Sequence, residues 1–375
     1  MLPVNKDKKN TILVAPLHWG LGHATRCIPI IRELLAQNAF VLLAADGMVA
    51  TLLRKEFPQL TILPLKSFTI QYPQGRKGFF LKILRLFPSA IFCFYREKKW
   101  LRKTIKKYAI DAVISDNRMG LYNKSIPCIY ITHQLSIKTG LFSRTEKWAQ
   151  KIHYYFINRF YQCWVPDFEE KEVSLAGDLS HPNVLPKIPV KYINPLSRFE
   201  NIINKPLQYN YLVLLSGPEP QRSIFEDLLL KQISSVEGSF LLVRGLPEEV
   251  SIPQQVKNAT IINHLSAETL NEAIIKSDII ISRSGYTTVM DLFKLQKKAI
   301  LVPTPGQPEQ EYLASHLLKH KIFYTTTQED FVLKDVLNSA RNFINNFSIN
   351  STNMNSYKTS IADFLLSLNR GNPKN

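Results

Sequence analysis

Short apolar runs with β-strand character alternate with helical stretches along this chain, and the alternation stops once and then restarts. The first series lies at residues 11–16, 40–45, 61–65, 112–116, 128–132 and 163–167, and the second at 211–217, 239–245, 259–265, 278–285 and 298–304. Strands that alternate with helices form β-α-β units, because a parallel neighbour requires a long crossover connection. The pattern therefore predicts an α/β protein with two successive domains.

The stretch between the two series, residues 183–209, is rich in proline and asparagine. Both residue types favour turns and loops over regular elements. We therefore predict a linker over 183–209, an N-terminal domain over 1–195 and a C-terminal domain over 209–375. The length of 375 residues agrees with two domains, since a domain averages about 150 residues.

The chain is strongly basic, with a formal net charge of +17. Such a charge indicates an anionic partner, which can be nucleic acid, an acidic membrane surface or a phosphorylated ligand. The basic residues are concentrated beside apolar ones, and no nucleic-acid-binding motif is present, so we expect no nucleic-acid partner. The four cysteines are far apart and lack C-x-x-C spacing, which disfavours a zinc site or a disulfide framework. We expect no bound metal.

Much of the charge lies in residues 76–107, where eleven Lys or Arg and seven aromatic residues accompany a single acidic residue. This segment is too short and too charged to span a bilayer, but it suits an anionic membrane surface. The alternative is an amphipathic helical pair with a solvated basic face. A second aromatic and basic stretch, 138–164, is interpreted as helical packing. The expected docking residues are Phe79, Phe80, Lys82, Arg85 and Phe87.

Ligands of open α/β sheets bind beyond the carboxyl ends of the strands, so the loops there are informative. In the first domain, HWGLGHATR joins a strand to a helix; Gly20 and Gly22 allow a sharp turn and close approach of a substrate. His23 then lies in the first helical turn, where an imidazole is kept neutral and can act as a general base. The alternative is a structural histidine. Asp116, a second candidate base, and His133 follow neighbouring strands.

Two loops of the second domain suit a phosphate. SGPEPQR places Ser216 and Gly217 between a strand and a helix, where backbone N–H groups can meet an anion; an ordinary tight turn is the alternative. SRSGYTTVMDL places Arg283 before a helix-starting Ser284–Gly285 turn. The same motif offers two further candidate binding residues, Thr288 for a phosphate and Asp291 for a ribose diol.

The alternative for SRSGYTTVMDL is a capping threonine with a first-turn carboxylate, which does not explain Arg283. A third loop, PTPGQPEQE, presents Gln310 between two glutamates. It is either a rigid turn that offers polar groups to a ligand or a helix start with favourable acidic residues. The loop SGPEPQR lacks the G-x-x-x-x-G-K-[ST] pattern, so a P-loop ATPase is disfavoured.

Taken together, GLGHATR and SDIIISRSGYTTVMDL…KKAILVPTPGQPEQEYLA resemble the GT-B glycosyltransferases, and among them family 28. That family includes the UDP-GlcNAc transferase of lipid II synthesis and the monogalactosyldiacylglycerol synthases. The resemblance implies two Rossmann-like domains facing across a cleft. It places His23, with Gly20, Gly22 and His133, on the acceptor side, and it implies inverting transfer.

On the donor side, the resemblance places Ser216 and Gly217 at the diphosphate, and Arg283 and Gly285 on the arginine–glycine pair of the donor signature. Gln310 falls on a glutamine that contacts the donor sugar. Three departures stand out: Asp291 replaces a longer glutamate at the ribose, Leu313 replaces a frequent asparagine, and SGPEPQR lacks the fuller glycine-rich form.

The sequence thus predicts an inverting hexosyltransferase that uses a nucleotide sugar, expected to be UDP-linked, and a lipid or cell-envelope glycan acceptor. No other cofactor is expected, and the absence of D-x-D disfavours a metal-bridged diphosphate. The expected location is cytoplasmic, peripheral on the inner face of the membrane. The alternatives are a GT-B nucleotide-sugar hydrolase or epimerase, a basic nucleic-acid- or membrane-binding protein without catalysis, and an inactive GT-B scaffold.

Overall fold

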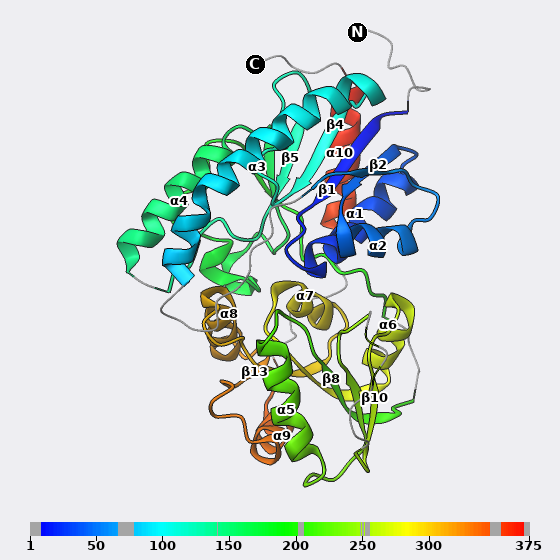
Figure 1. Cartoon of the computed structure of the whole chain (residues 1–375), viewed down its shortest axis with the longest axis vertical. Coiled ribbons are helices and arrows are strands. Elements are labelled where there is room, and N and C mark those ends of the chain that lie inside the picture. Colours follow the sequence, from blue (N-terminus) through cyan, green and yellow to red (C-terminus); the bar gives the residue numbers. More distant parts are fainter. Residues whose placement is uncertain are drawn as a thin grey trace. The chain divides into compact units, whose positions relative to one another are not determined.

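The chain folds into two compact units, drawn in Figure 1 from a computed structural model. The first unit comprises Met1–Gln71, Phe80–Arg198 and Thr352–Asn375, and the second comprises Tyr72–Phe79 and Phe199–Ser351. The structure describes residues 9–66, 79–140, 142–201, 206–247, 249, 251, 256–345 and 354–370, with side chains omitted for 79–88 and 90.

The first unit contains a parallel sheet of seven described strands in the order β3-β2-β1-β4-β5-β6-β7. Its strands are β1 (Thr11–Pro16), β2 (Phe40–Ala45), β3 (Ile62–Pro64), β4 (Ala112–Asp116), β5 (Cys128–Ile131), β6 (Gln162–Val165) and β7 (Val190–Tyr192). Its helices are α1 (Leu21–Ala36), α2 (Gly47–Glu56), α3 (Phe79–Tyr108), α4 (Ser143–Ile157) and α10 (Ser356–Asn369). Buried residues of α3 and α4 cover one face of this sheet.

The second unit repeats the design with six described parallel strands in the order β10-β9-β8-β11-β12-β13. Its strands are β8 (Tyr209–Leu214), β9 (Phe240–Val243), β10 (Ala259–Ile262), β11 (Ser277–Ser282), β12 (Lys298–Leu301) and β13 (Tyr324–Thr325). Its helices are α5 (Gln221–Ile233), α6 (Ala267–Ile275), α7 (Tyr286–Lys294), α8 (Pro308–Lys319) and α9 (Leu333–Asn342).

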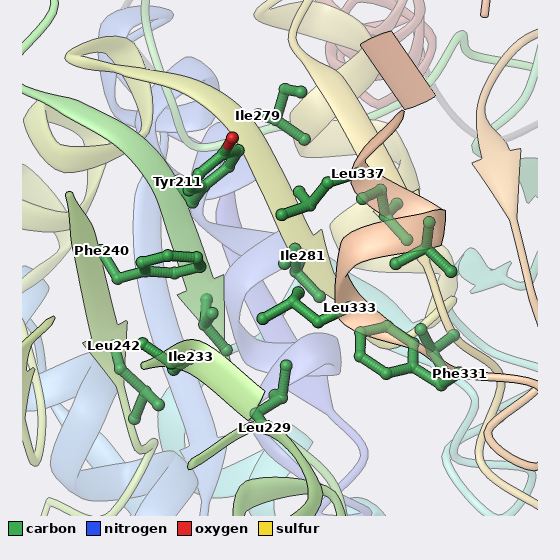
Figure 2. Packing of buried hydrophobic residues seen from close by; sticks show 14 of the residues in the cluster. Tyr211, Leu229, Ile233, Phe240, Leu242, Ile279, Ile281, Phe331, Leu333 and Leu337 are labelled. Atoms are coloured by element: carbon green, nitrogen blue, oxygen red, sulfur yellow. The ribbon is translucent and has the colours of Figure 1, made fainter. Parts of the chain in front are cut away.

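Burial on both faces explains why the central strands are nearly continuous apolar runs. In the second unit, Leu229 and Ile233 of α5 and Leu333 and Leu337 of α9 pack on one face of the sheet, as Figure 2 shows. The strands are held in register, so their carboxyl ends form a common edge. Pro16 pairs with Asp116 in the first unit. The α/β prediction with two domains is confirmed.

The C-terminal helix belongs to the first unit, so the predicted domain 209–375 is wrong at its end. The reason is an apolar face on α10 that packs there: Ile361 is fully buried, and the Phe364 ring lies 5.7 Å from that of Trp164. Lys191 also donates to Asp363 at 3.0 Å. This partner surface lies far away in sequence, which is why the order of elements does not predict it.

The predicted linker 183–209 is also partly wrong, because its first half continues the first sheet. β7 pairs in parallel with β6, and the chain passes between the units at Arg198 and Phe199. Proline stands immediately before this strand, at Pro189, where a missing N–H is tolerated at a sheet edge. Its carbonyl still accepts a hydrogen bond from the backbone N–H of Cys163.

The basic segment forms one helix of 30 residues, α3, rather than a helical pair. Among the described residues, no helix is long and apolar enough to cross a membrane. The helix begins at Phe79, but the side chains of the expected docking residues Phe79, Phe80, Lys82, Arg85 and Phe87 lie outside the described residues.

Candidate active site

The turn between β1 and α1 brings His23 to the carboxyl edge of the first sheet, as predicted. Gly20 precedes the helix with a φ of 94°, a conformation that favours glycine over any residue with a β-carbon. The helix then begins at Leu21. Gly22 lies in its first turn, where its carbonyl accepts a hydrogen bond from the Thr25 hydroxyl at 3.0 Å. His23 is therefore the third helical residue.

His23 faces Asp116, the last residue of β4. Both carboxylate oxygens lie 3.3 Å from the Nδ1 atom of His23. Asp116 is fully buried, whereas the His23 side chain keeps 16% of its surface exposed. The two candidate catalytic residues of the first domain thus meet, with the carboxylate behind the ring and part of the ring open to a substrate.

Arg26 completes this cluster, and the sequence analysis missed it as a functional residue. It lies one helical turn after His23, on the same face of α1. Its Nε donates to Asp116 at 2.8 Å, and its Nη2 also donates to that carboxylate. Nη2 lies 2.8 Å from His23 Nδ1, and Nη1 lies 3.2 Å from Nδ1 of His133, which follows β5. One signal could have identified Arg26. An aspartate at the end of a buried strand, such as Asp116, needs a positively charged partner nearby.

The cluster holds Asp116 ionised and His23 neutral. Burial by itself raises the pKa of Asp116, but the Arg26 guanidinium and His23 together hold it well below its usual value. Burial lowers the pKa of His23, the Arg26 charge lowers it further, and Asp116 opposes both. In the tautomer with the proton on Nδ1, that N–H donates a hydrogen bond to Asp116 and Nε2 has a free lone pair; in the other tautomer, Nδ1 accepts from Arg26 Nη2. The first tautomer can take a proton from a hydroxyl.

In the second unit, three loops start at the same level of the sheet edge. Ser282 of β11 pairs with Leu214 of β8 on one side and with Leu301 of β12 on the other. After β8, the predicted residues Ser216 and Gly217 are both exposed. Gly217 has a φ of 107°, so a residue with a side chain is disfavoured there. This pair leaves an open backbone turn ahead of α5.

Thr304, in the loop after β12, is a candidate that the sequence analysis did not select. It is 1% exposed, and its hydroxyl has no hydrogen-bond partner among the described residues. A β-carbon built at Gly217 would lie 4.0 Å from that hydroxyl oxygen. A buried hydroxyl without a partner costs free energy unless a ligand satisfies it. The space beside Gly217 is therefore a place where a polar ligand group fits.

The N-terminus of α7, which begins after Gly285, is a second candidate site for an anion. Gly285 is the N-cap residue, it makes no side-chain cap, and a β-carbon built on it would meet nothing within 4 Å. The first N–H groups of a helix attract negative charge. Thr288 lies half-buried in the first turns of this helix, and Asp291 lies buried one turn later. These placements agree with a ligand at the start of α7.

Arg283 lies just after the end of β11, at the place that the sequence suggested, and its side chain joins the surrounding loops. Its guanidinium is buried, and its terminal nitrogens donate to the carbonyl oxygens of Gln221 at 2.8 Å and Pro303 at 3.2 Å. They also donate to the Gln328 side chain at 2.7 Å, and the group lies over the Phe225 ring. Burial lowers the pKa of Arg283 to about 10. These contacts hold the loops together.

Ser284 and Gln310 also brace these loops. The Ser284 hydroxyl donates to the carbonyl oxygen of Gln310 at 3.0 Å. The Gln310 side chain accepts from the backbone N–H of Thr304 at 2.9 Å and donates to Gln307 at 2.6 Å. The structure thus brings Ser284, Gln310 and Thr304 together. Within the described part of the chain, no group of three or more His, Cys, Asp or Glu residues could hold a metal ion.

Comparison with known proteins finds a family model that matches part of the second unit and the C-terminal helix. Residues 226–364 match the Glycosyltransferase family 28 C-terminal domain. The chain is similar to the UDP-N-acetylglucosamine–N-acetylmuramyl-(pentapeptide) pyrophosphoryl-undecaprenol N-acetylglucosamine transferases of two bacteria. For Sulfurihydrogenibium sp. the identity is 23% over 216 residues, and the match spans just over half, 56%, of each chain. For Haemophilus ducreyi the identity is 23% over 335 residues, covering 84% of this chain and 85% of the relative.

Solved structures share the fold at lower identity. The calicheamicin glycosyltransferase CalG4 is similar with a TM-score of 0.67 and 12% identity, over 98% of this chain and 100% of CalG4. Identity this low supports the fold alone. The two parallel sheets with interleaved helices are the two Rossmann-like domains of the GT-B fold, as the sequence predicted.

Proposed function

We propose that this chain, a family 28-like glycosyltransferase of the GT-B fold, transfers a hexose from a nucleotide sugar to a hydroxyl of a lipid or cell-envelope glycan acceptor, with inversion. UDP is the proposed nucleotide. The observation that carries the proposal is the His23–Asp116 pair, held by Arg26 at the carboxyl edge of the first sheet. The names of the two bacterial relatives support a lipid-linked acceptor.

In the proposed reaction, Nε2 of His23 takes the proton of the acceptor hydroxyl as its oxygen attacks the anomeric carbon. The new bond forms from the face opposite the departing diphosphate, and the nucleoside diphosphate leaves with the electron pair of the broken bond. Asp116, ionised throughout, stabilises the imidazolium that forms. General-base help of this kind typically contributes about 10²–10⁴-fold in rate.

The second unit supplies the groups that suit the leaving diphosphate. The N-terminus of α7 at Gly285 offers backbone N–H groups, and the exposed turn at Ser216 and Gly217 lets an anion approach the main chain. The Thr304 hydroxyl supplies a further donor. Preorganised donors of this type stabilise charge that develops as the bond breaks.

A nucleotide-binding measurement tests the donor side. We expect UDP to raise the thermal midpoint of the chain more than GDP, ADP, CMP or dTDP do, since a ligand of the native state stabilises it by RT ln(1 + [L]/Kd). Thr304→Val removes the hydroxyl while keeping the shape, and it should reduce this shift. Thr260→Val, on an exposed strand position of the same unit, is the matched control. A shift equal in all three proteins would exclude Thr304 from the site.

Product analysis tests the reaction. Native protein given UDP-hexose and a polyprenyl-diphosphate-linked glycan acceptor should release UDP only when acceptor is present, and His23→Ala should reduce this release by about 10²-fold or more. Release of free hexose without acceptor would identify the hydrolase instead, and a changed UDP-sugar would identify the epimerase. The proposed location at the inner face of the membrane is tested by fractionating cells and assaying each fraction for the chain.

A further inference from the structure

A buried ion pair between Arg118 and Glu97 lies close to the candidate active site, and the proposed reaction does not use it. Arg118 follows Asp116 by two residues, in the loop after β4, and Glu97 belongs to α3. The two residues are 1% and 4% exposed. Nε of Arg118 donates to the Glu97 carboxylate at 2.9 Å, and Nη2 lies 2.8 Å from the same oxygen. A buried ion pair often contributes little net stability compared with apolar residues of similar volume, so stability alone does not explain why this loop carries one.

The guanidinium of Arg118 also connects the ends of different strands. Nη1 donates to the carbonyl oxygen of Pro16, the last residue of β1, at 3.3 Å. Nη2 donates to the carbonyl oxygens of Leu65 and Lys66, which follow β3, at 3.4 Å and 3.3 Å. The carbonyl oxygen of Arg118 itself accepts a hydrogen bond from the hydroxyl of Ser115, in β4, at 2.7 Å. One side chain therefore joins the ends of β1 and β3 to the loop that follows β4.

Two of these strand ends carry the candidate catalytic pair. Pro16 pairs with Asp116 across β1 and β4, and the chain continues from Pro16 through the turn that leads to His23. A shift of one strand end against the other would therefore alter the 3.3 Å separation between His23 Nδ1 and the Asp116 carboxylate. Arg26 contacts both members of this pair directly, whereas Arg118 holds the backbone that carries them.

We propose that Arg118, oriented by Glu97, is a positioning residue for the reaction: it fixes the end of β1 against the end of β4 and thereby sets the separation of His23 from Asp116. This role rests on the proposed function, since it concerns the same site. The planar guanidinium suits such a role because its donors point in fixed directions and can serve a carboxylate and several carbonyl oxygens at once, whereas a lysine ammonium cannot. The alternative is an ion pair that contributes to stability and has no effect on the catalytic pair.

Four variants separate these two roles. Arg118→Met removes the guanidinium and leaves Glu97 buried without its partner. Arg118→Met combined with Glu97→Gln removes both charges, and the new amide keeps an oxygen for the backbone N–H of Gly120, which donates to Glu97 at 3.1 Å. Arg118→Lys keeps a positive charge beside Glu97 but loses the planar fork. Phe364→Ala is the control for stability, because it weakens the packing on Trp164 in the same unit.

We expect Arg118→Met and Arg118→Lys to lower kcat for transfer by roughly 10²-fold, the loss that a misplacement of about 1 Å can cause. KM for UDP-hexose should stay unchanged, because the groups that suit the donor belong to the second unit. The double variant should regain thermal stability relative to Arg118→Met without regaining kcat. Phe364→Ala should lose stability and keep kcat at a temperature where it is folded. Recovery of kcat together with stability in the double variant, or an equal loss of kcat in Phe364→Ala, would overturn the proposal.

The pKa of His23 provides a second readout, one that requires no turnover. Burial lowers this pKa, Arg26 and His133 lower it further, and Asp116 raises it. Arg26 lies on α1 together with His23, so a displaced end of β4 weakens the effect of Asp116 more than that of Arg26. The double variant is the one to titrate by NMR, because it leaves the net charge of the chain unchanged.

We expect the double variant to have a lower pKa at His23 than the native chain, and Phe364→Ala to have the native value. A native value in the double variant would overturn the positioning role. A native chain that binds UDP but transfers no hexose would instead refute the proposed function, and the titration would still decide whether Arg118 positions the pair.

Discussion

Replacing Arg26 by methionine should raise the pKa of His23. In the native chain, burial lowers this pKa and the Arg26 charge lowers it further, while the Asp116 carboxylate opposes both. Arg26 Nη2 lies 2.8 Å from His23 Nδ1, and the Asp116 oxygens lie 3.3 Å from the same atom. Methionine removes the repulsion between two cations and also leaves the full negative charge of Asp116 facing the ring. Both changes favour the imidazolium.

The expected size follows from these short distances. Two unit charges about 4 Å apart interact by about 4 kcal/mol at an effective dielectric constant of about 20. The ring of His23 is 16% exposed, so solvent reduces this figure. Even a third of this interaction energy would shift the pKa of His23 by about one unit, since one pKa unit corresponds to about 1.4 kcal/mol. The change should therefore be readily measurable.

The assay is an NMR titration of the histidine ring resonances, with His23 assigned by its loss in His23→Gln. Arg26→Met alone leaves a buried carboxylate without its partner, which costs about 3–5 kcal/mol of stability. The double variant Arg26→Met with Asp116→Asn removes both charges and serves as the control. We expect the pKa of His23 to rise in the single variant and to fall back in the double variant. No rise in the single variant, or an equal rise in both, would refute the electrostatic account of the cluster.

The same change has a consequence for turnover. A general base works in its neutral form, so the native chain should keep its rate at pH values below the usual pKa of histidine. In Arg26→Met the acid limb of the pH–rate profile should move to higher pH. A variant that lost rate equally at every pH would instead point to a structural defect.

Three other changes probe the rest of the chain. Phe364→Ala should destabilise the first unit by about 3–5 kcal/mol, because the ring packs on Trp164; hydrogen exchange should show the loss there and not in the second unit. Asp167→Ala should strongly lower the urea midpoint, because this buried carboxylate accepts hydrogen bonds from three backbone N–H groups and two serine hydroxyls; an unchanged midpoint contradicts this. Arg283→Met should diminish the UDP-induced thermal shift, and Arg283→Lys should not restore it, because lysine cannot reach several carbonyl groups at once.

The fold was largely predictable because the information is local. Each central strand is an apolar run that is buried on both faces, and the loops with glycine and polar residues follow strand ends. Parallel pairing then brings those loops to one edge without any further information, as the pairing of Pro16 with Asp116 illustrates. This arrangement by itself brings His23 and Asp116 close together, because they follow or end neighbouring strands. The family resemblance of the loops added the GT-B fold to the two domains that the strand pattern had already predicted.

The elements that escaped prediction depend on partners far away in sequence. β7 has three residues and lies in a proline-rich stretch, and it is a strand because it can pair with the edge of β6. The helix α10 carries an ordinary apolar face, and nothing in its own residues distinguishes the first unit from the second. Its partners, among them Trp164 and Lys191, lie more than a hundred residues earlier.

Arg26 and Arg283 show that a residue type alone does not settle the role of an arginine. Both guanidinium groups are buried, and their terminal nitrogens donate to groups of the protein itself, whereas Nε of Arg283 has no partner among the described residues. Arg26 finds a carboxylate, and it thereby sets the charge state of the neighbouring histidine. Arg283 donates to carbonyl oxygens. Among the residues that the structure describes, no carboxylate pairs with it, so its charge adds to the field of the α7 N-terminus. The role of each arginine thus follows from the groups that its buried side chain reaches, a carboxylate for Arg26 and carbonyl oxygens for Arg283.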